Sequence, residues 1–320
     1  MKKLKNIALL LILMNLTFPT IQMQGNEIKQ TTIETSEYDE TQEYMVSNTT
    51  NDDTEIIQLT DKYDENEPNY RIDEFGNLLE ENVLEPYSVD HRELIKNTTD
   101  SPYSGTVFLY IQFEGVSTDG KSITLGTSCS GAIIDSNTTI TAAHCITKPQ
   151  IQIQQGEITY TLNTVAKNVR VFPGNSGSIT PFGYFDVSEI KYPKQYSIPE
   201  INTGRDIALL TLEGTVPSEI NKFNVTSDYK QYAYSTGYPG EKVKEMYQTQ
   251  GEYFFEYNQI TLYKLEGTQG QSGSPIYNAK NEIMSVMSRS SHAYPENFDG
   301  IKDGRTPYVE GANFANENME

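Results

Sequence analysis

The stretch "SCSGAIIDSNTTITAAHC", residues 128–145, contains two runs of small and β-branched residues separated by polar turn residues. Runs of this kind are typical of short strands. Similar runs recur down to the C-terminal part of the chain, at 106–113, 158–166, 168–172, 207–212, 232–238, 251–257, 260–265, 275–278 and 282–288. Helical periodicity is nearly absent, so the sequence predicts an all-β sandwich or barrel protein. About twelve strands are too many for one small barrel, which favours two barrels.

The N-terminus has the layout of a secretory signal peptide. Lys2, Lys3 and Lys5 precede the apolar run "IALLLILMNLTF", and Pro19 follows it. This run is too short for a comfortable membrane span, and a buried N-terminal helix is the alternative interpretation. We expect residues 1–24 to be a signal peptide and the product to be a secreted protein without stable membrane association.

The next segment is strongly acidic. Between Glu27 and Pro86 there are 18 Asp and Glu residues, against Lys29, Lys62 and Arg71. Few aliphatic residues occur there, and such a segment cannot bury enough apolar surface to offset the entropy of ordering it. We expect residues 25–85 to be a disordered propeptide, with a solvated linker as the alternative. The compact domain would then span residues 86–320.

The net charge of the whole chain is −20 at pH 7. Binding of nucleic acid needs a basic face, so this charge argues against a nucleic-acid partner. We expect the domain to be a monomer.

The chain has two cysteines, Cys129 and Cys145. An even number of cysteines in an exported chain predicts a disulfide, here one worth about 3 kcal/mol by its effect on chain entropy. A metal site would need more ligands than the neighbouring His144 supplies. We therefore expect no metal and no other cofactor.

Two residues are candidates for a base and its orienting acid. His144 follows the run "TITAA", and a disulfide at Cys145 would hold its loop in place, although a histidine at a strand end is more often structural. Asp206 directly precedes the apolar run "IALLTL", where it could fix the tautomer of an imidazole. A turn aspartate is the alternative for Asp206, and Asp186 is a weaker candidate for the same role.

The stretch "GQSGSP" contains the candidate nucleophile, Ser272. Gly270 allows the backbone to turn so that the amides of Gly270 and Ser272 can point at one spot as an oxyanion hole. Ser274 precedes Pro275 and is therefore expected in an extended strand start, which is a poor position for a nucleophile. The order His144, Asp206, Ser272 is one of those in which the Ser–His–Asp triad occurs.

With these residues in hand, the stretches "TITAAHC", "RDIALL", "STGYPGEK" and "GQSGSPIYN" resemble the bacterial glutamyl endopeptidase branch of the trypsin-like serine proteases, which includes the exfoliative toxins. The resemblance covers about residues 86 to 318. It implies two six-stranded antiparallel β-barrels, about 104–212 and 213–318, with the active site in the cleft between them. It also implies a zymogen in which Ser272 is the nucleophile, His144 the base and Asp206 its orienter.

The chain departs from this family at the residues that read the substrate. Gln271 stands where trypsin has an aspartate that pairs with the new N-terminus. Members of the family read an acidic P1 side chain, the one before the cleaved bond, with a histidine about 15 residues after the nucleophile and a threonine five before it. Here Met287 and Gly267 occupy those positions, with Thr268 adjacent, and a thioether cannot donate a hydrogen bond to a carboxylate.

The tentative substrate pocket therefore consists of Thr268, Met287, Arg289 and His292, and we expect a weakened preference for glutamate at P1. The sequence predicts a secreted serine endopeptidase that works through an acyl-enzyme. The alternative is a catalytically silent or narrowly specific binding module, like an exfoliative toxin, on the same fold.

Overall fold

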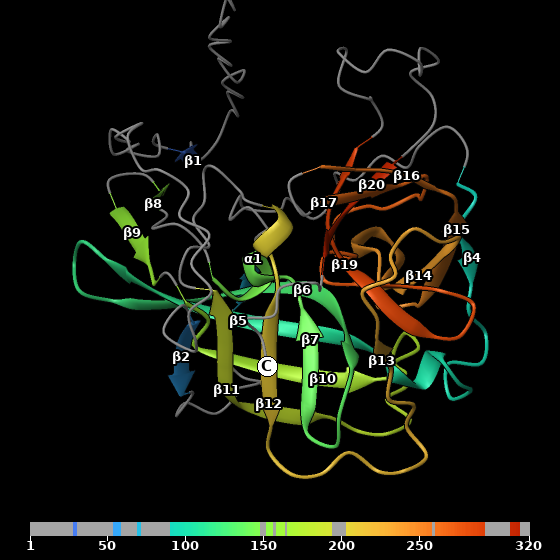
Figure 1. Ribbon diagram of the computed structural model, residues 1–320. Helices are drawn as coiled ribbons and strands as arrows, with labels where there is room; N and C mark the ends of the chain where they lie inside the picture. The colour runs from blue at the N-terminus through green and yellow to red at the C-terminus, as the bar shows by residue number, and fades with distance from the viewer. Residues whose placement is uncertain are drawn as a thin grey trace, which may run out of the picture.

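The computed structural model describes residues 90–147, 152–155, 158–163, 165–193, 203–257, 260–291 and 308–313, and three short stretches at 28–30, 54–58 and 69–71. This part of the chain is mostly strand and forms two sheets (Figure 1). The signal peptide expected at residues 1–24 lies outside the described residues. In the described part, no helix is long and apolar enough to cross a membrane.

The first sheet contains a closed barrel of six strands. In order around the barrel, these strands are β5 (Thr106–Ser117), β10 (Asn168–Pro173), β11 (Phe185–Pro193), β12 (Ala208–Leu212), β7 (Thr138–Thr141) and β6 (Ser122–Ile133). The antiparallel pairing of β5 with β6, from Thr106 opposite Ala132 to Val116 opposite Ser122, closes the barrel. Two further strands, β8 (Gln152–Gln155) and β9 (Ile158–Leu162), extend the sheet from the far end of β5.

The second sheet is an open half-barrel. Its order is β16 (Tyr253–Tyr257), β17 (Ile260–Tyr263), β20 (Tyr308–Asn313), β19 (Glu282–Ser291), β18 (Pro275–Tyr277), β14 (Ala233–Gly237), β15 (Tyr247–Gly251) and β4 (Glu93–Leu94), with β13 (Asn224–Val225) beside β19. Among the described residues, no pairing joins β4 to β16. The predicted two-barrel architecture is confirmed, with the first barrel closed and the second only half formed.

The start of the domain belongs to the second half of the fold. Although β4 precedes the first barrel in the sequence, it pairs with β15, where Leu94 lies opposite Tyr247. The chain then crosses to the first barrel through the 3₁₀ turn η1 (Tyr103–Gly105). Residues 90–94 therefore tie the beginning of the domain to the sheet that carries Ser272.

Three stretches of the acidic segment pair with the first sheet. They are β1 (Ile28–Gln30) against β8, β2 (Thr54–Gln58) against β11, and β3 (Asn69–Arg71) against β6. These pairings lie within the segment that is expected to be a disordered propeptide, and the sequence did not predict them. Strand addition satisfies backbone hydrogen bonds without needing a core, which composition alone does not reveal. Removal of the segment as a propeptide stays a prediction.

The largest apolar core fills the closed barrel and reaches the helix that carries His144. Alternate residues of β5, namely Val107, Leu109, Ile111 and Phe113, are fully buried, as the period of a strand requires. The same cluster continues through the apolar residues of α1 (Ala143–Ile146). The barrel core thus anchors α1, which lies where the two sheets meet in Figure 1.

Candidate active site

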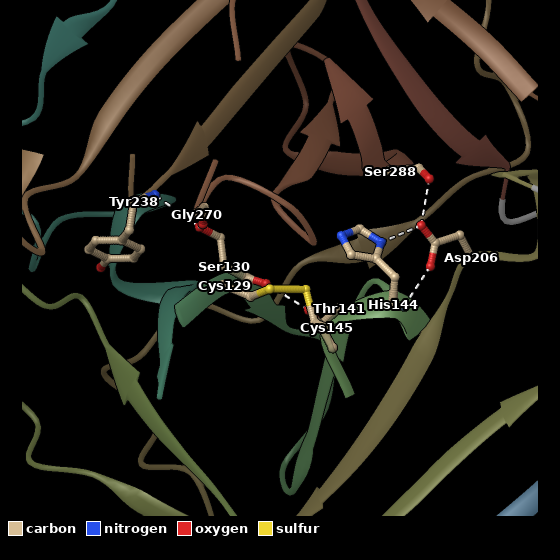
Figure 2. The surroundings of a disulfide bond; sticks show 9 residues. All are labelled: Cys129, Ser130, Thr141, His144, Cys145, Asp206, Tyr238, Gly270 and Ser288. Atoms are coloured by element: carbon tan, nitrogen blue, oxygen red, sulfur yellow. Dashed lines mark hydrogen bonds and ion pairs between the residues drawn. A yellow bond between two sulfur atoms is a disulfide. The ribbon is translucent and has the colours of Figure 1, made fainter. Parts of the chain in front are cut away.

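His144 lies in a one-turn helix that a disulfide fixes to the barrel. The strand β7 ends at Thr141, and α1 places His144 beside Cys145. Cys145 is bonded to Cys129 of β6 with an S–S distance of 2.09 Å (Figure 2), so the predicted disulfide is confirmed. From the sequence, the strand was expected to continue through Ala143, and the helical turn was not predicted. The residues that lead into the turn, 138–143, are β-branched or small, as in a strand. The turn itself has four helical residues, which are too few to produce a periodic pattern.

Asp206 is fully buried and binds His144 twice. Its Oδ1 accepts a hydrogen bond from the backbone N–H of His144 at 2.8 Å, and its Oδ2 lies 2.6 Å from His144 Nδ1. An ionised carboxylate only accepts hydrogen bonds, so Nδ1 carries the proton. The second ring nitrogen points away from Asp206 in Figure 2, and in a neutral ring it is the acceptor.

A third group also holds the carboxylate. Ser288 Oγ donates to Asp206 Oδ2 at 2.5 Å from β19 of the other sheet. Burial by itself raises the pKa of Asp206, but the neighbouring imidazole and the hydrogen bonds from His144 and Ser288 outweigh it and lower the pKa. Asp206 is therefore ionised near neutral pH, as an orienting acid must be. Ser288 is one of four serines between residues 285 and 291, and nothing in the sequence distinguishes it from the others, so it was not predicted.

Ser272 lies in a turn that packs on the end of the first barrel next to α1. The Ser272 carbonyl accepts a hydrogen bond from Ser130 N at 2.8 Å, and Gly273 N donates to Met287 O at 2.8 Å. Gly273 has φ +82°, and a Cβ there would lie 2.1 Å from Thr141 Oγ1 and 2.9 Å from Ala142 N. Only glycine permits this approach. The turn that carries Ser272 therefore meets the residues that directly precede His144.

Gly270 is equally constrained. It has φ +87°, and a Cβ would lie 2.6 Å from the Tyr238 carbonyl oxygen and 2.7 Å from Gly240 N. Ser130 Oγ accepts from Tyr238 N at 2.9 Å and donates to the Gly270 carbonyl at 2.8 Å, as Figure 2 shows. Within the described part of the chain, the amides of Gly270 and Ser272 donate no hydrogen bond. The role of Ser130 in binding the Gly270 carbonyl was not predicted from the sequence.

Two residues of the tentative substrate pocket, Thr268 and Met287, are engaged in contacts within the protein. The Thr268 hydroxyl accepts from Arg92 Nη1 at 2.7 Å and donates to Glu241 Oε2 at 3.0 Å. Met287 is 2 % exposed and packs in a small core with Tyr263, Leu265 and Val309. Gly267 lies against it, since a Cβ there would be 3.1 Å from Met287 Sδ.

The remaining candidates are placed as follows. Arg289 is half-buried on β19, opposite Glu310 of β20. His292 lies outside the described residues. Asp186, the weaker candidate for the orienting acid, accepts a hydrogen bond from Arg170 Nε at 3.0 Å in the β10–β11 ladder and is not the partner of His144.

The comparisons with known proteins agree with this geometry. Residues 129–286 match the family model described as a trypsin-like peptidase domain. The chain is 27% identical over 216 residues to an extracellular metalloprotease of Bacillus subtilis, covering 62% of this chain and 61% of the relative. It is 24% identical over 203 residues to a glutamyl endopeptidase of Staphylococcus epidermidis, covering 62% of this chain and 63% of the relative. The chain thus spans less than two thirds of these curated relatives.

A solved structure of a Glu endopeptidase in complex with MPD is similar in fold. Its TM-score is 0.52 at 20% identity, and the match covers 71% of this chain and 94% of that one. The two-sheet fold, the His144–Asp206 pair and the domain match together support a protease of the trypsin fold. Among such proteases it resembles the glutamyl endopeptidases. The described residues contain no group of three or more His, Cys, Asp or Glu side chains arranged to hold a metal ion.

Proposed function

We propose that this chain is a secreted serine endopeptidase, made as a zymogen, that hydrolyses peptide bonds with Ser272, His144 and Asp206. Residues 1–24 would be the signal peptide and 25–85 the propeptide. The observation that carries the proposal is the double hydrogen bond from His144 to the fully buried Asp206 carboxylate. A structural histidine needs no ionised carboxylate without solvent access, whereas a catalytic base needs one to orient its ring.

In the proposed reaction, Ser272 Oγ attacks the carbonyl carbon of the scissile bond, and Nε2, the second ring nitrogen of His144, takes the hydroxyl proton. Asp206 stabilises the imidazolium, and the amides of Gly270 and Ser272 bind the oxyanion. Collapse of the tetrahedral intermediate breaks the C–N bond, and His144 gives its proton to the leaving amine. Water then hydrolyses the acyl-enzyme by the same steps, which regenerates Ser272 and releases the acid.

We also infer that the enzyme does not depend on glutamate at P1. Met287 and Gly267 offer no hydrogen-bond donor from their side chains to an acidic substrate, and the Thr268 hydroxyl is engaged with Arg92 and Glu241. A protein or peptide with a range of P1 side chains is the substrate class that fits these contacts.

The test compares two serines in the same turn. Ser272→Ala should lower kcat/KM to the background rate while thermal unfolding stays unchanged. Ser274→Ala is the matched control, because Ser274 is also fully buried but lies outside the proposed machinery. Its kcat/KM should stay within about threefold of wild type, the range of an ordinary substitution away from the reacting atoms. Near wild-type turnover by Ser272→Ala would refute the nucleophile, and absence of turnover in the wild type would favour the silent binding module.

A further inference from the structure

A buried arginine from the start of the domain contacts the turn that carries Ser272. The Arg92 side chain is 1% exposed, although it belongs to the short segment that precedes β4. Its Nη1 donates to Thr268 Oγ1 at 2.7 Å and to Gln271 Oε1 at 2.9 Å. Gln271 is the residue directly before Ser272. The contact therefore joins two segments that are about 180 residues apart in the sequence.

The Gln271 side chain transmits this contact to the backbone of the turn. Its Oε1 accepts from Thr268 N at 3.1 Å as well as from Arg92, and Gln271 N donates to the Thr268 carbonyl at 3.1 Å. Since a guanidinium has donors only, the side-chain oxygen of Gln271 must face Arg92. Residues 268–271 thus form a turn that is closed by hydrogen bonds between Thr268 and Gln271. Arg92 binds the Gln271 oxygen that takes part in this closure. Gly270 lies within that turn and Ser272 follows it.

Carboxylates balance the buried charge on the other side of Arg92. Asp90 binds the guanidinium through two oxygens, at 2.9 Å to Nε and 3.1 Å to Nη2, and Glu241 accepts a further hydrogen bond from Nη2. Lys242 Nζ lies 3.0 Å from Asp90. Burial by itself lowers the pKa of Arg92, but the hydrogen bonds and charges of Asp90 and Glu241 outweigh it and raise the pKa.

The planar fork of arginine suits this place better than an ammonium would. Its three nitrogens point in fixed directions, so one side chain holds Asp90, Glu241, Thr268 and Gln271 together. Glu241 completes the ring by accepting from Thr268. A lysine has the charge but not the geometry, so it can serve the carboxylates or the turn but not both.

We infer that Arg92 is a positioning residue for the active-site turn, which holds Thr268 to Ser272 in the conformation that aims the Gly270 and Ser272 amides at the oxyanion. This inference rests on the proposed function and adds a residue that neither the domain match (residues 129–286) nor the triad includes. It also makes the proposed oxyanion hole dependent on residues 90–92, at the start of the folded domain.

A double-mutant cycle tests the inference, with kcat measured on the processed enzyme obtained from the full-length chain. Arg92→Lys should lower kcat about tenfold to a hundredfold and leave KM within about twofold, since a misplaced oxyanion donor acts on the transition state. Gln271→Met, which removes the acceptor but keeps the length of the side chain, should have a similar effect. The double variant should be little worse than either single variant, because all three break the same link.

Arg170→Lys is the matched control. Arg170 is also a largely buried arginine paired with an aspartate, but it lies in the β10–β11 ladder of the first barrel. Its kcat should match that of the wild type. A normal kcat in Arg92→Lys, or effects of Arg92→Lys and Gln271→Met that simply multiply, would overturn the inference. If Arg92→Lys does not fold, Gln271→Met alone tests the inference, and a normal kcat in Gln271→Met would overturn it.

A second measurement separates this inference from the proposed function. Hydrogen exchange of the peptide that covers residues 266–274 reads the turn without any turnover. Exchange there should be faster in Arg92→Lys than in Arg170→Lys or the wild type, and equal rates would contradict the role of Arg92. If the wild type hydrolyses nothing yet exchange responds as expected, the proposed function fails and the link between Arg92 and the turn stands.

Discussion

The two sides of the candidate site are built in different ways. On one side, His144 and Asp206 come from the ends of the closed barrel, and a disulfide and three hydrogen bonds to one carboxylate fix them. On the other side, the wall around Thr268 and Met287 belongs to the open half-barrel. Its polar groups are tied to an arginine from the start of the domain. The catalytic side is held by the disulfide and by hydrogen bonds that converge on the Asp206 carboxylate, and the substrate side by contacts with the start of the domain.

This difference separates what each side can do. The proposed His144–Asp206 pair needs an ionised carboxylate and a neutral ring nitrogen that can accept a proton, and both residues come from the closed barrel. Recognition of an acidic substrate needs donors that are not already engaged. Thr268 has given its hydroxyl to Arg92 and Glu241, and Met287 has none to give. We therefore expect the catalytic side to be strict in its chemistry and the substrate side to be permissive.

The largest effect should come from the orienting acid. Asp206→Asn should lower kcat about 10⁴-fold, because a carboxamide can donate to Nδ1 and so favours the wrong tautomer of His144. The fold should persist, since the amide has nearly the same shape. Steady-state kinetics and thermal unfolding of the purified variant measure both.

Asp186→Asn is the matched control for that variant. Asp186 is a partly buried aspartate paired with Arg170, outside the site, so its loss should leave kcat unchanged. A large loss of kcat in Asp186→Asn, with little in Asp206→Asn, would exchange the roles of the two aspartates and break the account of the catalytic side.

Local motifs carried enough information to predict the catalytic side. The all-β class followed from β-branched runs and turn residues. His144 and Asp206 stood out because each lies at the end of such a run, and Cys129 and Cys145 because they are the two cysteines of the chain. Side chains at strand ends reach the rim of a barrel whatever the details of the pairing. Their roles could therefore be assigned before their distances were known.

The long-range contacts that support the two sides could not be predicted in this way. Arg92, Ser130 and Ser288 act through contacts with residues far away in the sequence, and nothing in their own surroundings marks them. The paired stretches of the acidic segment were missed for the same reason, because strand addition depends on the edge that accepts it. Thr268 was placed in the pocket because it is adjacent to Gly267, which stands where the family has a threonine. That position does not show where the Thr268 hydroxyl points.

The disulfide should matter for stability. The double variant Cys129→Ser, Cys145→Ser should unfold with a free energy lower by about 3 kcal/mol, because the unfolded chain loses its cross-link. Urea unfolding measures the change. Reductant should bring the wild type to the same midpoint and leave the double variant unaffected. A wild type that does not respond to reductant would show that the bond contributes no stability.

A smaller effect is expected in substrate choice. A peptide library should give rates after glutamate and after other P1 residues that differ by far less than the about 10⁴-fold discrimination of a site built to hydrogen-bond its substrate. The reason is that the Met287 side chain has no donor and the Thr268 hydroxyl is engaged by Arg92 and Glu241. Strong cleavage after glutamate alone would show that another segment supplies the missing charge, and it would remove the contrast between the two sides.

The smallest effect concerns acid stability at Asp90. The hydrogen bonds from Arg92 and Lys242 lower the pKa of Asp90 despite its partial burial. Because the pKa is lower in the folded state, the ionised Asp90 stabilises the fold at pH values above its ordinary pKa of about 4. This contribution to stability is lost as the pH falls below that value. Asp90→Asn should therefore flatten the dependence of the melting temperature on pH between about 5 and 3. Lys242→Met should have the same effect to a smaller degree, since Arg92 is the larger cause. An unchanged slope in Asp90→Asn would contradict it.

The most direct test of the central claim is the site of covalent labelling. The protein is treated with a fluorophosphonate, digested, and the modified residue is located by mass spectrometry. The account predicts one adduct, on Ser272, which is absent in Ser272→Ala and retained in Ser274→Ala. An adduct on another residue, or none on an active wild type, would contradict the assignment of Ser272 as the nucleophile.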